Sequence, residues 1–170
     1  MIMVKCIVLF VAASMLLGTL LGAEEKRPNE SALLTYLAGQ KFDPEAAKSF
    51  DADTYGMRKY VMAFLRSGPK RPATKEEAQK LQLAHLENIE KMAAAGKLVL
   101  AGPFLDGGEL RGIYIFAVAT IAEAEALTNS DPAIQAGSLA MELREWYGSA
   151  ALMALNPIHN RLAEKTITGK

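Results

Sequence analysis

Two helix-start motifs of the same form constrain the fold of this chain more than any other feature of its sequence. Thr74 is followed three residues later by Glu77, and Thr120 is followed at the same distance by Glu123. In such a capping box the threonine side chain accepts a backbone N–H of the first helical turn, and the glutamate accepts the N–H of the threonine. The two motifs predict two helices, at 74–95 and 120–129.

Segments rich in β-branched and aromatic residues lie on both sides of these helices, and such segments favour strands. Four are expected, at 59–66, 97–101, 110–119 and 139–147. In the third, Tyr114 and Phe116 fall on one face, and Ile113 and Ile115 fall on the other. Apolar side chains on both faces mean that both faces of the sheet need a cover.

The expected order of elements is β-α-β-β-α-β, which predicts an α+β fold. In this ferredoxin-like arrangement both helices lie on one face of an antiparallel sheet. The second face would then be covered most simply by the same face of a second copy. We therefore expect a homodimer with a barrel-like interior.

The balance of charges argues against nucleic acid as a partner. The chain has 170 residues, of which 51% are hydrophobic, so one domain with a substantial core is expected. Nineteen basic residues balance 19 acidic ones, and the net charge is zero. The attraction to phosphates that drives nucleic-acid binding is therefore missing.

Residues 1–23 have the pattern of a secretory signal peptide. Lys5 precedes a long apolar run that ends with Gly22 and Ala23. Cleavage near Ala23 predicts a secreted or periplasmic protein that is not held in the membrane. The competing interpretation is an uncleaved membrane anchor, because the run is close to the length of a membrane span. Cys6 is the only cysteine, so a cleaved protein would contain no disulfide and no thiol nucleophile.

The rest of the chain divides into three parts. Residues 24–57 are expected to form an N-terminal arm with short helices, at 31–37 and after Asp43-Pro44, which is a typical helix start. Residues 58–148 contain the expected β-α-β-β-α-β domain. Residues 149–170 are expected to be a C-terminal tail, apolar as far as Leu155 and polar beyond it.

One polar residue stands in the apolar face of the first predicted helix. Leu81, His85, Ile89 and Met92 are spaced four, four and three residues apart, so they lie along one side of the helix. Two interpretations remain for the imidazole. It is either a core histidine hydrogen-bonded to the backbone, or a functional group at the edge of a pocket.

The segment from about 60 to 147 resembles the YCII-related (YciI-like) family, part of the dimeric α+β barrel group. The resemblance rests on four pieces that come in the family's order. They are His85-Leu86, the segment 96–104, Gly112, and the segment 131–137 with its Asp131-Pro132 start. It implies a ferredoxin-like protomer that dimerises through its sheet.

The same resemblance implies a pocket in which His85 and Asp131 lie together. A carboxylate that accepts from one ring nitrogen raises the basicity of the other, which can then take a proton. A few relatives act on chlorinated hydroxyquinones, so a lyase or dehydrochlorinase type of reaction is implied. The chain departs from the family pattern at Ala133, where an aromatic residue is usual. The alternative for Asp131 is a helix cap without a further role.

Four further residues are candidates for substrate binding. Arg111 could bind an anionic group or be a solvated edge charge, and Tyr114 could line the pocket or fill the core. Gly102 and Pro103 belong to the strand motif of the family resemblance. No cofactor or metal is expected, since no HxH or HExxH spacing occurs. The second histidine, His159, is expected to be solvated in the tail.

Two functional hypotheses of different class follow. The first is an exported, cofactor-free enzyme that uses His85 and Asp131 for acid/base chemistry of the elimination or lyase type on a small molecule. The second is a non-catalytic module of the cell envelope that holds a small ligand in the same pocket. A third, less specific possibility is a purely structural dimer.

Overall fold

The computed structural model of the protein describes residues 41–169. The expected signal peptide at 1–23 and the expected helix at 31–37 lie outside these residues. Residues 42–169 belong to one compact unit. None of its helices has both the length and the hydropathy that crossing a membrane requires.

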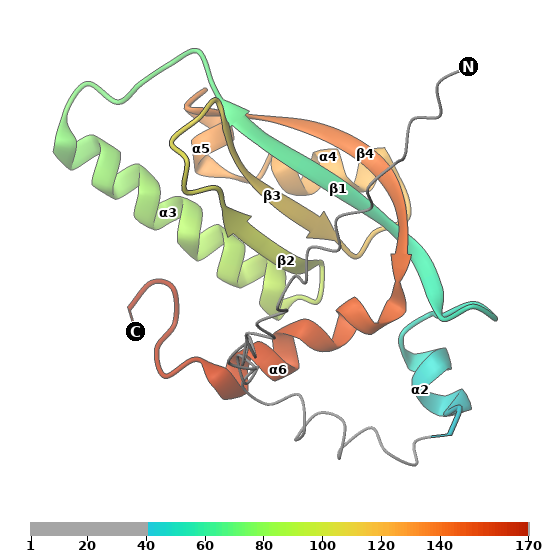
Figure 1. Ribbon diagram of the computed structural model, residues 1–170. Helices are drawn as coiled ribbons and strands as arrows, with labels where there is room; N and C mark the ends of the chain where they lie inside the picture. The colour runs from blue at the N-terminus through green and yellow to red at the C-terminus, as the bar shows by residue number, and fades with distance from the viewer. Residues whose placement is uncertain (1–40, 170) are drawn as a thin grey trace, which may run out of the picture. The chain divides into compact units, whose positions relative to one another are not determined.

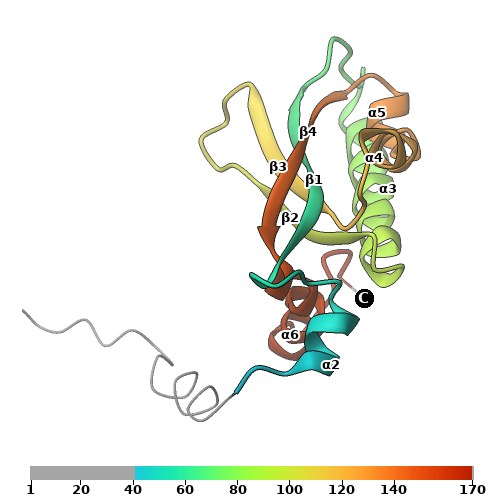
Figure 2. The ribbon, with the colours of Figure 1, turned by 90° about the vertical axis from the view of Figure 1, so that its right-hand side faces the viewer.

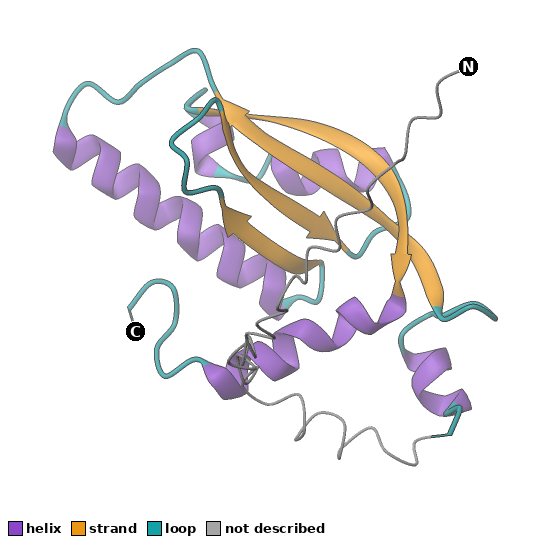
Figure 3. Cartoon of the chain, viewed as in Figure 1, coloured by secondary structure: helices purple, strands orange, loops and turns teal. Residues whose placement is uncertain are grey.

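A four-stranded antiparallel sheet forms the centre of this unit (Figures 1 and 3). Its strands are β1 (Met57–Ser67), β2 (Leu98–Pro103), β3 (Leu110–Phe116) and β4 (Leu139–Ser149). They lie side by side in the order β2-β3-β1-β4, so the first and third strands occupy the middle. This order of strands, together with the helices between them, is the ferredoxin-like α+β fold predicted from the sequence.

Three helices cover one face of the sheet, as Figure 2 shows edge-on. They are α3 (Lys75–Ala94), α4 (Ile121–Thr128) and the short α5 (Pro132–Gln135). Both predicted capping boxes are formed, at Thr74 and at Thr120, with their reciprocal hydrogen bonds. The predicted order β-α-β-β-α-β is therefore confirmed, with α5 as an added turn before β4.

The main core lies between these helices and the sheet. Alternate residues of each strand face the helices, as the period of two requires. From β1 and β3 these are Val61, Ala63, Leu65, Tyr114 and Phe116, all buried. The half-buried Leu139, Met141 and Leu143 of β4 complete the layer.

The predicted helix start at Asp43-Pro44 is also present. It opens α2 (Pro44–Ser49), and the Asp43 side chain accepts from Glu45 and Ala46. This helix ends before β1 and buries none of its residues. The cap at Asp43 therefore stabilises the start of this helix, and buried side chains do not contribute.

The C-terminal segment, which the sequence predicted only as a tail, contains two helical elements. A 3-10 helix, η1 (Ala150–Ala154), follows β4 directly and leads into α6 (Leu155–Leu162). Leu152 and Met153 pack against the second face of the sheet, and the Asn156 side chain donates to the Leu98 carbonyl at 2.7 Å. The segment folds in this way because the apolar run after β4 reaches the second face within a few residues.

The second face is thus covered in part by the chain itself. Tyr60, Val99 and Ile115 are buried under the C-terminal segment. Further along the same face, Phe64 and Ile113 are half-buried neighbours in the register of β1 and β3. The chain itself thus covers part of the face for which a second copy was expected as the simplest cover, and among residues 41–169 nothing covers the apolar remainder.

Candidate functional site

His85 and Asp131 lie together in the interior, although 46 residues separate them in the sequence. The Nδ1 atom of His85 is 2.7 Å from Oδ2 of Asp131 and 3.0 Å from Oδ1. The carboxylate is fully buried, and the histidine is 8% exposed. A buried carboxylate needs partners to offset the loss of water, so this contact organises its surroundings.

Local sequence positions each member of the pair. Leu81, His85 and Met92 share one side of α3, which directs the imidazole toward the sheet. Asp131 is the N-cap of α5, and its Oδ1 accepts the N–H of Ala133 at 2.8 Å. The carboxylate therefore caps a helix and binds the histidine at the same time, and the two interpretations of Asp131 are compatible.

Tyr114 of β3 contacts the other side of the imidazole. Its hydroxyl lies 3.2 Å from Nε2 of His85, and its side chain is buried. Because a carboxylate only accepts hydrogen bonds, we assign the proton of a neutral His85 to Nδ1. Nε2 is then the acceptor, and the Tyr114 hydroxyl donates to it.

The surroundings keep the Tyr114 phenol protonated. Burial is the main cause that raises its pKa above the ordinary value, and the negative charge of Asp131 adds to it. The result is a chain of three side chains, Asp131–His85–Tyr114, in which each donor meets an acceptor. Sequence analysis left Tyr114 between pocket and core, and the structure places it in the core with its hydroxyl on the histidine.

Two polar residues that the sequence analysis did not single out support this chain. Asn88 is buried one turn after His85, and its side-chain oxygen accepts from the Ser130 hydroxyl at 3.3 Å. Ser130 precedes Asp131, so this bond ties the start of α5 to α3. One feature of the sequence could have identified Asn88, because it is a second polar residue on the apolar side of the helix, three positions after His85.

The other candidates lie elsewhere. Arg111 is exposed, and its guanidinium donates to the hairpin carbonyls of Gly107 and Gly108. Gly102 and Pro103 pair with Ile113 and Gly112 across the sheet, on the strand next to the one that carries Tyr114.

The second histidine stays apart from this site. His159 is exposed on α6. In the part of the chain that the structure describes, no three or more His, Cys, Asp or Glu side chains form a group that could hold a metal ion.

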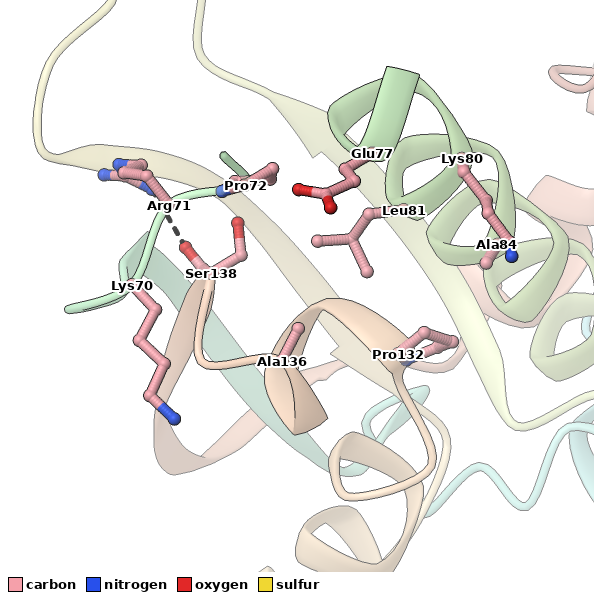
Figure 4. A pocket seen from close by; sticks show the side chains of 10 residues that line it. All are labelled: Lys70, Arg71, Pro72, Glu77, Lys80, Leu81, Ala84, Pro132, Ala136 and Ser138. Carbon is pink, nitrogen blue, oxygen red and sulfur yellow. Dashed lines mark hydrogen bonds between the residues drawn. The ribbon is translucent and has the colours of Figure 1, made fainter. Parts of the chain in front are cut away.

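An open groove of about 460 Å³ lies between the helix that carries His85 and the helix that Asp131 caps, and neither member of the pair lines it (Figure 4). It runs between α3, α5 and the loop before α3. Leu81 and Ala84 line it from the helix that carries His85, and Pro132 lines it directly after Asp131. The groove thus shares α3 and α5 with the pair.

A comparison with models of known protein families gives one match. The model of the YCII-related domain matches residues 62–147, which is half of the chain and includes all three members of the buried network. The protein belongs to the YCII-related domain family. The resemblance drawn from the sequence motifs is thereby confirmed.

A solved structure is similar to part of this YCII-related protein. It is the 5-chloro-2-hydroxyhydroquinone dehydrochlorinase from Burkholderia phenoliruptrix, in complex with 2,5-dihydroxybenzoquinone. The alignment has 23% sequence identity and a TM-score of 0.39, and it covers 52% of this chain and 93% of the other. No curated protein matches the chain.

The raised pKa of Tyr114 predicts a pH dependence of stability. The folded state holds the phenol proton where the unfolded chain releases it, so this contribution is complete below about pH 10 and is lost as the pH rises further. We expect the free energy of unfolding to fall more steeply above about pH 10 in the wild type than in Tyr114→Phe, by about 1 kcal/mol per pH unit. Urea unfolding between about pH 8 and 11 measures both slopes, with the exposed Tyr55→Phe as control. Equal slopes for the wild type and Tyr114→Phe would contradict the assignment.

Proposed function

We propose that this YCII-related protein is a small-molecule enzyme in which His85 moves a proton and Asp131 sets the orientation and basicity of the imidazole. One observation carries the proposal, namely the contact of 2.7 Å between Nδ1 and a fully buried carboxylate. This contact fixes the tautomer and leaves Nε2 as the basic atom. Membership of the family and the adjacent groove support a small molecule as substrate.

The geometry restricts how the proton reaches the histidine. The Tyr114 hydroxyl is 3.2 Å from Nε2 and donates a hydrogen bond to it, so the atom that would take the proton already has a partner. Either the acidic group of a substrate displaces this hydroxyl, or the hydroxyl relays the proton. In both routes Asp131 keeps its position, because the Ala133 N–H and the imidazole hold its two oxygens.

The reaction that suits this arrangement is an elimination. Nε2 takes a proton from carbon or oxygen of the substrate, and the electron pair of the broken bond forms a new double bond. A leaving group departs with its own electron pair, and the imidazolium returns its proton to solvent or to the product. This balance needs no oxidant or reductant from outside.

A ligand-binding module is the second candidate, and one observation favours it. His85 is only 8% exposed and both of its nitrogens have partners, as in a structural network that shapes a pocket. Such a module would bind a small molecule without any proton transfer. The test must therefore detect proton transfer itself and not binding alone.

Proton exchange with deuterium oxide provides this test without knowledge of the product. The protein is mixed in deuterium oxide with a panel of small carbon acids that include phenols and hydroxylated quinones, and loss of the acidic C–H signals is followed by NMR. We expect catalysed exchange for at least one compound. His85→Gln should abolish it, and Asp131→Asn should reduce it by about 10-fold to 100-fold.

Two further variants serve as a control and as a test of the two proton routes. His159→Gln removes the exposed histidine of α6 and should leave the exchange rate unchanged. Tyr114→Phe separates the two routes, since a relay would be lost and a displaced hydroxyl would leave the rate intact or higher. Binding of panel compounds without any exchange would overturn the enzyme in favour of the binding module, and exchange that survives in His85→Gln would overturn the role of His85.

We also propose that the protein forms a homodimer through the uncovered part of its second sheet face. Met62, Phe64 and Ile113 lie there with half-buried apolar side chains, and charged residues such as Arg66 and Arg144 border them. Sedimentation equilibrium should give twice the mass of the single chain. Phe64→Glu should shift the mass to that of the monomer, whereas Leu105→Glu, at a hairpin tip that is 94% exposed, should not. A wild type that stays monomeric at high concentration would contradict the proposal.

Export through the N-terminal segment is proposed from the sequence pattern of residues 1–23. Expression of the full chain in a bacterium with two membranes should give a periplasmic protein. Its intact mass should correspond to a chain that begins at Glu24. A membrane-bound protein of full mass would instead identify the segment as an anchor.

A further inference from the structure

Asn88 is a buried amide beside His85 on α3. The buried residues of this helix are His85, Asn88 and Met92, and their spacing of three and four residues places them on one side. Asn88 is 9% exposed. A buried amide costs free energy unless it is hydrogen-bonded, and an apolar side chain in its place would avoid this cost. The hydrogen-bond partners of Asn88 therefore indicate what the amide does.

The amide of Asn88 contacts the residue that precedes Asp131. Its Oδ1 atom lies 3.3 Å from the Ser130 hydroxyl, and its Nδ2 atom lies 3.9 Å from the sulfur of Met92 on the same helix. Asp131 follows Ser130 directly and is both the N-cap of α5 and the partner of His85. Two consecutive residues at the start of α5 thus contact two residues of α3 that are about one turn apart.

The two contacts match in spacing. Three residues of an α-helix rise by about 4.5 Å, and consecutive Cα atoms of a chain lie about 3.8 Å apart. The helices α3 and α5 lie next to each other on one face of the sheet (Figure 2). A single contact would let the start of α5 rotate against α3, whereas two contacts at this separation fix their relative rotation. The contact between Asn88 and Ser130 therefore limits the positions that Asp131 takes against His85.

The turn before α5 has hydrogen bonds of its own that do not involve Asn88. The Ser130 N–H donates to the Leu127 carbonyl at 3.1 Å. The Asp131 N–H donates to the Thr128 carbonyl at 3.0 Å. The Ser130 hydroxyl has one proton, and it lies closer to the Leu127 carbonyl, at 2.7 Å, than to Asn88. Local bonds therefore hold the turn, and the contribution of Asn88 is the attachment of this turn to α3.

We propose that Asn88 is a positioning residue for the His85–Asp131 pair, because it holds Ser130 and thereby keeps the neighbouring carboxylate aligned with the imidazole. In this role Asn88 touches no reacting atom. Its effect passes through the contact of 2.7 Å between Nδ1 of His85 and Oδ2 of Asp131. The catalytic consequence rests on the proposed function, since the carboxylate sets the tautomer and the basicity of Nε2. The alignment of the carboxylate can be measured without a substrate.

NMR of the histidine ring measures this alignment. A buried Nδ1 proton that is bonded to a carboxylate resonates downfield of the amide region and exchanges slowly with water, and its loss in His85→Gln assigns the signal. In Asn88→Leu we expect this proton to exchange with water about 2-fold to 10-fold faster. The free energy of unfolding should not fall, because leucine removes the buried amide and the Ser130 hydroxyl keeps the Leu127 carbonyl. An unchanged ring signal in Asn88→Leu would overturn the proposal.

Variants of the partner residue separate alignment from packing. Ser130→Ala removes the hydroxyl and should change the ring signal as Asn88→Leu does, whereas Ser130→Thr keeps a hydroxyl and should retain the wild-type signal. The double variant Asn88→Leu/Ser130→Ala should have no larger effect than either single change, because both remove the same bond. Gln82→Leu makes the same amide-to-leucine change at an exposed position of α3 and should leave the signal unchanged. Additive effects of the two single changes would overturn the proposed link.

Proton exchange in deuterium oxide distinguishes failure of this proposal from failure of the proposed enzyme. With the phenols and hydroxylated quinones of the panel, Asn88→Leu should lower the catalysed exchange rate by about 2-fold to 10-fold, and Ser130→Thr should retain it. A protein that exchanges no panel compound, but whose ring signal changes in Asn88→Leu, would retain the positioning role and remove the enzyme. An unchanged ring signal and an unchanged exchange rate in Asn88→Leu would remove the positioning role and retain the enzyme.

Discussion

The buried carboxylate of Asp131 is the group on which the arrangement of the site depends. A charge without water is costly unless hydrogen bonds surround it, and here an imidazole and a backbone N–H do so. These partners are in place because α3 holds His85 opposite the start of α5, and because α5 begins where the chain turns toward β4. The hydroxyl of Tyr114 then joins the sheet to the same network. One desolvated charge thus links three elements that are far apart in the sequence.

The groove is a consequence of this packing. Because Asp131 draws the start of α5 against α3, the short helix leaves a hollow toward the loop before α3, and that loop is held at a distance set by Gly68 and Gly137. The same few contacts therefore set the position of the pair and the shape of the groove.

Local patterns predicted most of the fold. Both capping boxes begin helices where expected, and Tyr114 and Phe116 share one face of β3 as the alternation predicted. The C-terminal helices were missed because an apolar run of a few residues has no period of its own that distinguishes a strand, a turn or a helix. Their role became visible only from the sheet face against which Leu152 and Met153 pack. Asn88 was missed for a similar reason, since its partner Ser130 lies 42 residues away.

The sequence by itself determined the class of fold, the starts of the helices, and the presence of one histidine in an apolar helix face, because these follow from spacings of a few residues. With its motifs it also indicated the family. Only the tertiary structure decided that Asp131 both caps a helix and binds His85, and that the Tyr114 hydroxyl meets Nε2 of the same histidine. These contacts span 29 to 46 residues along the chain. They depend on how α3 and α5 pack on the sheet, which no local spacing encodes.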